Sequence, residues 1–209
     1  MRAPKVKPKR FKVASKPRVM GDKYQRILDA AVSVFAEKGF HVARVADVAE
    51  RASVADGTIY LYFRNKEELL MTAINTAFNA FMSRARTELE AIASPSGKLR
   101  RLARLHLEAF GSNRDLAIVF QMELRQSARF LAPFSHQQMV DYFSLVRAAI
   151  REGQAQGIFR PGLRDKIAAN CFFGAIDEMV TSWVLDETHY PLAEVADSVA
   201  DIILFGLEG

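Results

Sequence analysis

Cysteine is almost absent from this 209-residue sequence, since Cys171 is the only one and stands in an apolar run. A single cysteine excludes a disulfide framework and any zinc site built from several cysteines, and it favours a reducing cytoplasm. No apolar stretch approaches the length of a transmembrane span, and the first residues lack the apolar core of a secretory signal. The sequence therefore predicts a soluble cytoplasmic protein, with Cys171 as a small buried apolar residue.

Motifs of catalysis and nucleotide binding are also missing. The sequence has no GxSxG, GxGxxG or GxxxxGK[ST] segment, and its four histidines lack HExxH spacing. Asp177 and Glu178 are adjacent carboxylates, but neighbours on a helix point about 100° apart and are poor partners for one substrate atom. We therefore expect no enzyme, no cofactor and no metal site. Asp177 lies among apolar residues, which indicates a buried hydrogen bond in a pocket, at a subunit contact or in a plain structural role.

Positive charge is concentrated at one end of the chain. Residues 1–20 carry eight Lys and Arg and no acid, whereas the net charge of the whole chain is only +5. Three prolines interrupt this segment, which has no apolar periodicity, so residues 1–21 are predicted to form a disordered basic arm. Beside a DNA-binding unit such an arm can follow phosphates or enter a minor groove. The alternative is a solvated tail.

From residue 22 onward the apolar residues recur at the spacing of α-helices, and no segment alternates as a β-strand does. A first helix ends at Gly39, and two short helices follow from Val45 and from Asp56, joined by a tight turn. This arrangement is typical of a helix-turn-helix. Asn65 is expected to cap a fourth helix that continues to Ile92. Later helices are predicted at 97–111, 115–130, 135–156, 165–187 and 192–206, giving an all-α fold of about nine helices.

The third helix presents two tyrosines to solvent in this interpretation. Ile59 and Phe63, four residues apart, pack inward, so Tyr60 and Tyr62 must face outward. A phenol can donate to a phosphate oxygen while its ring packs on a sugar or a thymine methyl. The alternative is that the tyrosines merely pack. Three further residues are candidates for DNA contact: Gly57 for close backbone approach, Thr58 for its hydroxyl and methyl, and Lys66 for a phosphate at a helix N-terminus.

Residues 39–69, GFHVARVADVAERASVADGTIYLYFRNKEEL, closely resemble the DNA-binding domain of the TetR family of bacterial transcriptional regulators. The resemblance is carried by the segments 39–40, 45–49, 57–60, 62–63 and 66–67. It implies a helix-turn-helix domain at 22–68 and a divergent ligand-binding and dimerisation domain at 69–209. It also implies a homodimeric repressor that occupies an operator and is released by a bound effector.

Three positions depart from the family pattern. Ala43 and Arg44 stand where Thr or Ser usually caps the second helix, and we expect Arg44 to supply a phosphate contact instead. Ser53 replaces the usual turn glycine, so this turn must tolerate a Cβ. Ala55 replaces the usual Ser cap of the third helix. Asp56 then becomes the expected cap, and its carboxylate can also accept from a cytosine amine.

A narrower resemblance covers most of the chain. VADGTIYLYF (54–63), DLAIVFQMELRQS (115–127) and FFGAIDEMVTSWVL (172–185) are similar to the fatty-acid-degradation regulators that bind long-chain acyl-CoA. This resemblance implies control of fatty-acid degradation genes and release by long-chain acyl-CoA. One alternative is a sensor of another hydrophobic compound. Another is a helical lipid carrier or enzyme that keeps a decayed DNA-binding domain.

Aromatic and basic residues of the second domain supply candidates for ligand binding. Eleven of the 15 phenylalanines lie after residue 70, and most of them must be core. Arginines three or four residues apart on one helix form clusters able to bind CoA phosphates, or else a solvated face. The candidate ligand-binding residues are Phe78, Phe81, Arg101, Arg104, Phe110, Phe120, Arg125, Arg129, Phe143 and Asp177.

The last two long helices are expected to form the dimer contact, as an intersubunit four-helix bundle. Small residues there allow close helix approach, and apolar residues supply buried area. The small ones are Ala168, Cys171, Gly174 and Ala175, and the apolar ones are Val180, Trp183, Val184, Val195, Val199 and Ile203.

Overall fold

The computed structural model of the protein describes residues 21–124, 138–186 and 190–208, and all the regular secondary structure within these ranges is helical. The all-α prediction is confirmed. The α-helices are α1 (Asp22–Lys38), α2 (Val45–Arg51), α3 (Asp56–Tyr60), α4 (Lys66–Glu90), α5 (Pro95–Gly111), α6 (Arg114–Ile118), α8 (Gln138–Ala155), α9 (Asp165–Leu185) and α10 (Ala196–Glu208). The π-helix η1 (Val119–Leu124) follows α6, and the 3₁₀-helix η2 (Leu192–Val195) precedes α10. None of the described helices is long and apolar enough to cross a membrane.

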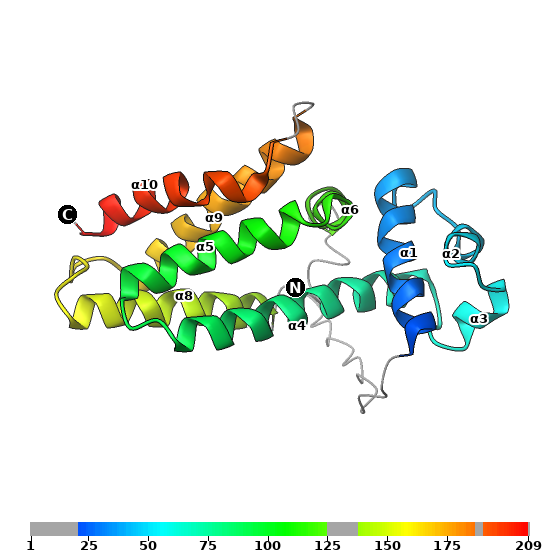
Figure 1. The fold of residues 1–209 in the computed structure, drawn as a ribbon, viewed down its shortest axis with the longest axis horizontal. Helices are drawn as coiled ribbons and strands as arrows, with labels where there is room; N and C mark the ends of the chain where they lie inside the picture. The colour runs from blue at the N-terminus through cyan, green and yellow to red at the C-terminus, as the bar shows by residue number, and fades with distance from the viewer. Residues whose placement is uncertain (1–20, 125–137, 187–189, 209) are drawn as a thin grey trace, which may run out of the picture.

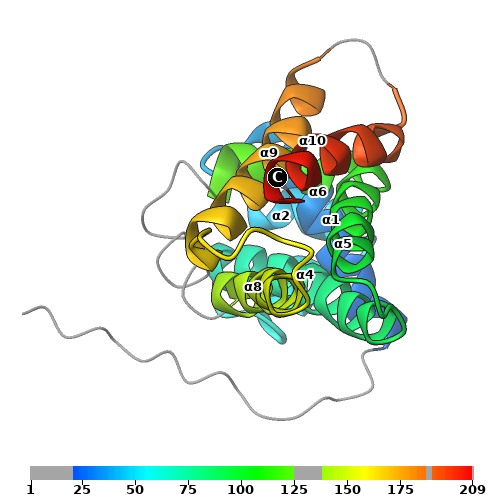
Figure 2. The same ribbon diagram turned by 90° about the vertical axis from the view of Figure 1, so that its left-hand side faces the viewer.

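The helices form two bundles that share α4 (Figure 1). The short helices α2 and α3 lie with α1 at one end of the molecule. At the other end α5 packs against α4, α8, α9 and α10. Figure 2, which looks along the molecule from the C-terminal end, shows α8 beside α4 and α9 beside α10. The long α4 therefore runs from the small bundle into the large one.

Each bundle has its own hydrophobic core, and α4 contributes to both. Leu70 and Ile74 are buried in the core of the small bundle, whereas Met82 and Leu89 are buried in the core of the large one. Phe78 lies between them and packs against both cores. A movement of α4 in the large bundle is therefore transmitted to α1–α3 without an intervening flexible loop.

The α6–η1 segment is a second connection between the bundles. Val119 is fully buried in the small core, and Leu116 and Phe120 pack against that core. Gln121 Nε2 donates to Asp177 Oδ1 of α9 at 2.8 Å, and both side chains are buried. The helix predicted over 115–130 is helical as far as it is described, but α6 ends at Ile118 and the chain continues as a π-helix to Leu124, while 125–130 lie outside the described residues. π-Helical turns are rare and often mark functional sites.

The start of α4 is capped as predicted. Asn65 Oδ1 accepts from the Glu68 backbone N–H at 2.7 Å. The Glu68 carboxylate reaches one residue further back than a standard capping box, and accepts from the Arg64 N–H at 2.7 Å. This cap fixes the chain between α3 and α4, and so fixes the orientation of α3.

Candidate nucleic-acid interface and ligand cavity

Two buried side chains fix the orientation of α3. Ile59 and Phe63 are buried in the small core, as the helical spacing predicts. Tyr60 lies between them and is 58% exposed. Tyr62 is 44% exposed, and its ring meets the edge of Tyr24 with the centroids 5.5 Å apart. Both tyrosines face outward as predicted, and Tyr62 is also held by α1.

The first turn of α3 is open to solvent. The helix begins after Ala55, so Asp56 is its first residue, and the Asp56 side chain makes no capping hydrogen bond. The prediction that Asp56 caps α3 is therefore wrong. A Cβ on Gly57 would meet no atom within 4 Å. The packing of the protein itself does not require a glycine there. Thr58 is half-buried beside it.

The turn before α3 carries the expected strain. Ser53 has a φ of 54°, in the left-handed region that glycine adopts freely.

Arg44 precedes α2, where its N–H donates to the Asp47 carboxylate at 2.7 Å and its side chain lies exposed. This hydrogen bond, with one from Lys38 Nζ, holds the pKa of Asp47 below its usual range. The start of α2 is thus satisfied from within the helix, although the usual Ser or Thr cap is missing.

Lys66 does not offer a free charge to DNA, contrary to the sequence prediction. Its Nζ donates to the carbonyl oxygens of Phe40, His41 and Ala43 at 2.5, 3.2 and 2.8 Å, and lies 4.5 Å from the centre of the Phe40 ring. An ammonium has three protons, and these carbonyls accept all of them. Lys66 instead ties the start of α4 to the loop between α1 and α2, and so positions α2 and α3.

We expect Lys66→Ala to lower the free energy of unfolding by about 2–4 kcal/mol, because three carbonyls lose a charged donor. Urea denaturation followed by circular dichroism measures this effect. Lys23→Ala, which removes an exposed lysine of α1, is the matched control and should change stability little. A Lys66→Ala protein as stable as the control would contradict the positioning role.

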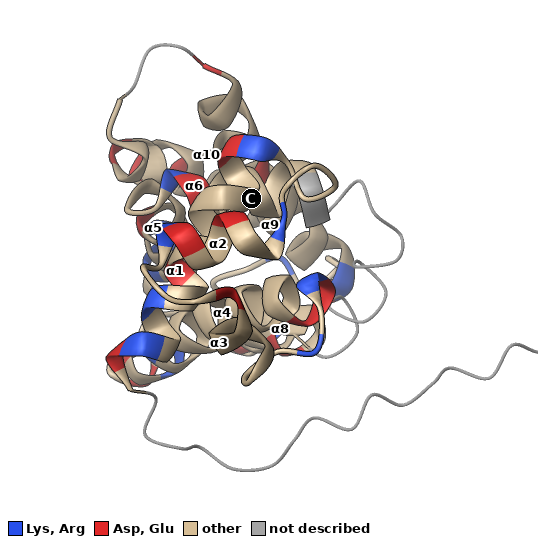
Figure 3. Cartoon of the chain, turned by 90° about the vertical axis from the view of Figure 1, so that its right-hand side faces the viewer, with Lys and Arg blue, Asp and Glu red and all other residues tan. Residues whose placement is uncertain are grey.

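Charges of both signs lie at this end of the molecule (Figure 3). Arg51 of α2 pairs with Glu37, and Lys38 lies 3.0 Å from Asp47. The described part of this end therefore does not present a single basic patch. The basic arm predicted at 1–21 lies outside the described residues except for Gly21.

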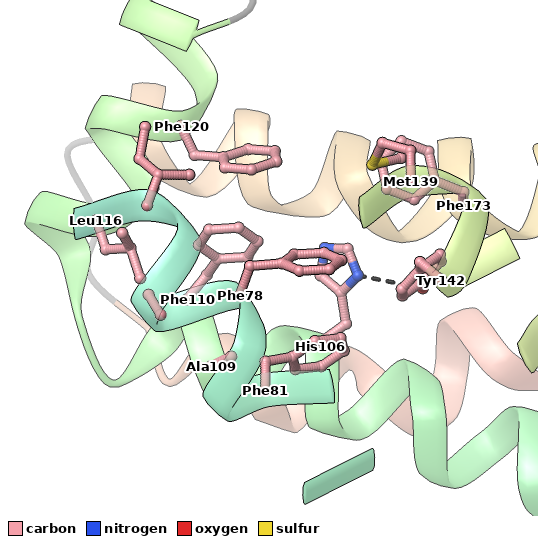
Figure 4. Close-up of a pocket in the computed structure, with 12 residues that line it drawn as sticks. Phe78, Phe81, His106, Ala109, Phe110, Leu116, Phe120, Met139, Tyr142 and Phe173 are labelled. Atoms are coloured by element: carbon pink, nitrogen blue, oxygen red, sulfur yellow. Dashed lines mark hydrogen bonds between the residues drawn. The ribbon is translucent and has the colours of Figure 1, made fainter. Parts of the chain in front are cut away.

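A cavity lined almost entirely by apolar side chains lies between α4, α5, α6, η1, α8 and α9 (Figure 4). The empty space at this site is about 540 Å³, a figure that includes space open to solvent. Its lining consists of Ile74, Ala77, Phe78, Phe81, His106, Ala109, Phe110, Leu116, Phe120, Met139, Tyr142 and Phe173. Four of the aromatic residues predicted to bind ligand are among them. Phe143, also predicted, lies behind this lining, with its ring centre 5.4 Å from that of Phe173.

Two polar side chains in the cavity wall were not predicted. His106 is 6% exposed and Tyr142 is 2% exposed, and His106 Nδ1 lies 3.2 Å from Tyr142 Oη. Burial lowers the pKa of His106 to about 4, whereas burial and the charge of Asp177 raise that of Tyr142. Both groups are neutral at pH 7. One sequence pattern could have predicted the burial of His106. It lies in helical register with Leu99, Leu102 and Ala103, on the buried face of α5.

Because burial lowers the pKa of His106 to about 4, we expect stability to fall as the pH falls. Below pH ~6.5 the unfolded chain binds a proton at this residue, and the folded chain does not until about pH 4. The free energy of unfolding should therefore decline across this range by up to about 3 kcal/mol. Urea denaturation at pH 4–8 measures this decline.

His106→Phe should reduce the decline of the free energy of unfolding between pH 6.5 and 4. His41→Gln, at an exposed histidine, should leave this decline unchanged. If the free energy of unfolding declined equally with falling pH in wild type and in His106→Phe, a buried neutral histidine would be contradicted.

The chain matches two family descriptions that follow each other along the sequence. Residues 27–72 match "Bacterial regulatory proteins, tetR family", and residues 74–206 match "YsiA-like protein, C-terminal region". A fatty acid metabolism regulator protein of Bacillus subtilis (strain 168) is 36% identical over 185 residues, which cover 88% of this chain and 95% of the relative. The chain belongs to the TetR family. Members of this family are DNA-binding regulators and not enzymes.

Two solved structures of regulators are similar to this chain over most of its length. One is FadR from Bacillus subtilis in complex with stearoyl-CoA, with 36% identity and a TM-score of 0.82. The other is FadR from Bacillus halodurans, a fatty acid degradation regulator, with 38% identity and a TM-score of 0.81. Each comparison covers 88% of this chain and 99% of the other.

The described arginines that were predicted to bind CoA do not line the cavity of this TetR-family chain. Arg101 donates to Glu88 at 2.5 Å and to Glu108 at 3.0 Å, and Arg104 pairs with Asp197 of α10. These carboxylates pair with the guanidinium groups and neither arginine lies at the cavity, so a role of Arg101 and Arg104 in binding CoA stays a prediction. The other two predicted arginines, Arg125 and Arg129, lie outside the described residues.

Asp177 does not line the cavity either. It accepts the hydrogen bond from Gln121 described above, and so connects α9 to η1. This contact is a structural one, which was among the interpretations that the sequence left open.

A polar groove between α4 and α8 adjoins the cavity at Phe78. It is lined by Phe78, Asn79, Met82, Ser83, Arg86, Gln138 and Asp141. Arg86 lies 3.6 Å from Asp141. Gln138 Nε2 donates to Asn75 at 2.7 Å, while its Oε1 is buried without a hydrogen-bond partner. The groove therefore offers polar groups beside an apolar cavity.

The outer faces of α9 and α10 leave apolar residues exposed. Ile202 is 77% and Phe205 is 85% exposed on α10, and Ile167, Cys171 and Gly174 are exposed on α9. We call these five residues the α9–α10 strip. Cys171 is therefore not buried, contrary to the prediction.

Three of the apolar residues predicted for the dimer contact, Val180, Trp183 and Val199, are instead buried within the subunit. Val184, Val195 and Ile203 are partly buried against the same core. These six residues therefore pack mainly within the subunit and leave little apolar area for a contact with a second copy.

Proposed function

We propose that this protein is a cytoplasmic transcriptional repressor of fatty-acid degradation genes, which binds operator DNA as a homodimer and is released by long-chain acyl-CoA. One observation carries the proposal: the apolar cavity is walled by Leu116 and Phe120, which also pack against the core beneath the helix-turn-helix. A chain bound in this cavity contacts the support of α3. The similarity to FadR in complex with stearoyl-CoA supports the choice of ligand.

In this proposal α3 enters the major groove. The exposed phenols of Tyr60 and Tyr62 donate to phosphates, and Thr58 faces the base edges. The open space around Gly57 lets the DNA backbone approach α3 closely. Arg44 is exposed at the start of α2 and supplies a phosphate contact, and the exposed Asp56 accepts from a cytosine amine. The eight basic residues within 1–20 add attraction to phosphates that is independent of sequence.

We expect Tyr60→Phe to weaken operator binding about tenfold, since a hydrogen bond to a charged phosphate is lost. Stability should be unchanged because Tyr60 is exposed. Fluorescence anisotropy with an operator selected from random duplexes measures the affinity. Tyr190→Phe, in the large bundle, is the control. Binding isotherms that coincide for both variants and wild type would remove Tyr60 from the interface.

Two connections transmit ligand binding to the DNA-binding helices. An acyl chain in the cavity contacts Phe78 of α4 and Phe120 of η1, and both pack against the small core. Displacement of these rings shifts α1–α3 relative to the large bundle. In a dimer the two α3 helices must match successive major grooves ~34 Å apart, so a small shift suffices. The ligand needs to favour the shifted arrangement by only about 1–3 kcal/mol.

Native mass spectrometry of the protein purified from its own cytoplasm tests the ligand class directly. We expect a dimer that carries CoA thioesters with long acyl chains. Titration of the protein–operator complex with hexadecanoyl-CoA should then release the DNA. A different hydrophobic compound in the spectrum, together with no release by hexadecanoyl-CoA, would overturn the acyl-CoA proposal and favour a sensor of that compound.

A further inference from the structure

His106 brings an unpaired polar atom to the wall of the apolar cavity. Its Nε2 is buried and has no hydrogen-bond partner, while Nδ1 contacts Tyr142 Oη at 3.2 Å (Figure 4). A buried polar group without a partner is unfavourable, and native proteins rarely keep one without a reason. A ligand atom that pairs with Nε2 would remove this penalty.

The contact with Tyr142 decides which kind of ligand atom can pair with Nε2. If the phenol accepted from Nδ1–H, both the phenol proton and the bare Nε2 would lack partners. If the phenol donates to Nδ1, only the Nε2–H is left unpaired. The second arrangement leaves fewer buried groups unsatisfied, so Nε2 carries the proton. No group of the described residues lies within hydrogen-bonding reach of His106 Nε2. The ligand must therefore supply a hydrogen-bond acceptor.

The position of His106 indicates where along the ligand this acceptor lies. The polar groove adjoins the cavity at Phe78, and its residues Gln138 and Asp141 are chain neighbours of Met139 and Tyr142 in the cavity wall. Leu116 and Phe120 line the cavity next to the small core. A ligand with its polar head in the groove and its chain pointing toward Phe120 places the junction of the two parts beside His106. In an acyl thioester this junction is the carbonyl group.

We propose that His106 Nε2–H donates a hydrogen bond to the thioester carbonyl oxygen of the acyl ligand, and that Tyr142 positions the imidazole by donating to Nδ1. His106 thereby determines specificity for an acyl thioester over an alkyl chain without a carbonyl. This inference rests on the acyl-CoA function proposed above.

Gln138 offers a second unpaired polar atom, which can bind the part of the ligand next to the thioester. It precedes Tyr142 by one turn on the same face of α8, and its buried Oε1 lacks a partner. An acyl-CoA carries an amide N–H separated from the thioester by the sulfur and two methylenes. The unpaired donor of His106 and the unpaired acceptor of Gln138 thus match, in type and order, the carbonyl and the N–H of one ligand.

The test compares hexadecanoyl-CoA with its thioether analogue, S-hexadecyl-CoA, in which a methylene replaces the carbonyl. Calorimetry on the full-length protein without DNA measures both affinities. We expect the wild type to bind the thioester about tenfold more tightly than the thioether. His106→Phe should abolish this difference by weakening the thioester alone, and His106→Gln, which retains an N–H donor at the end of the side chain, should restore part of it.

The outcomes separate this inference from the proposed function. If the wild type binds neither compound, the acyl-CoA function fails and the inference fails with it. If it binds both equally, or if His106→Phe still prefers the thioester, the role of His106 is overturned while the function stands.

Nuclear magnetic resonance of ¹⁵N-labelled histidine checks the role of His106 without a substitution. We expect the His106 proton on Nε2, and a shift of that nitrogen with the thioester but not with the thioether. A proton on Nδ1 in the free protein would overturn the inference.

Discussion

Lengthening the acyl chain of the CoA thioester from eight to sixteen carbons should lower the concentration that releases the operator by as much as ~5 × 10⁴-fold. Each buried methylene contributes up to about 0.8 kcal/mol, or about fourfold in affinity, until the cavity is full. The cavity supports this expectation because aromatic rings and aliphatic side chains form nearly all of its wall. Fluorescence anisotropy of the preformed protein–operator complex measures the release, with free CoA and free hexadecanoate as controls.

Ala77→Leu provides a matched test of the same prediction, since Ala77 lines the cavity and a larger side chain shortens the space for the chain. The longest chains should lose their advantage in this variant. Ala80→Leu, on the exposed side of the same helix, should behave like wild type. If release of the operator did not depend on chain length in wild type, Ala77→Leu or Ala80→Leu, the acyl-CoA proposal would be wrong. The assignment to the TetR family would still hold.

Phe205→Asp should dissociate the dimer and weaken operator binding by more than ~10³-fold. We propose that the α9–α10 strip is the dimer contact, because it gathers Ile167, Cys171, Gly174, Ile202 and Phe205 on two packed helices. A carboxylate at this position, which is 85% exposed in the single subunit, would be buried against an apolar partner surface without a counter-charge. A single subunit binds only one half-site, and loses the gain from two linked contacts.

Analytical ultracentrifugation measures the dimer, and anisotropy with the operator measures binding. Val140→Asp is the control, because Val140 is an exposed apolar residue of α8 outside the strip. Circular dichroism should show both variants folded. A Phe205→Asp protein that remains dimeric at nanomolar concentration would exclude the strip as the contact.

The sequence predicted well wherever local spacing decides the outcome. Helical periodicity gave the all-α fold and the inward positions of Ile59 and Phe63, which in turn oriented Tyr60. The Asn65 cap was predicted from the residue and its distance to Glu68, because a cap depends only on neighbours in the chain. Aromatic residues at helical spacing also pointed to Phe78 and Phe81 in the cavity wall.

Charged residues were predicted less well, because a long side chain selects its partner from the tertiary structure. Lys66 turns to three carbonyls contributed by residues more than twenty positions earlier. Arg101 and Arg104 meet carboxylates of α4, α5 and α10. No spacing within one helix contains this information. The sequence therefore did not indicate the partners of these three side chains.

By itself the sequence determined the family, the helices and the side of α3 that faces outward, since these depend on residue type and on periods of a few residues. Only the tertiary structure decided which side of α9 and α10 stays exposed, because both sides of these helices are apolar and the sequence pattern cannot rank them. It also decided that His106 and Tyr142, 36 residues apart, share a hydrogen bond in the cavity wall. Packing of α5 against α8 brings them together, and this contact between distant segments leaves no mark on local sequence.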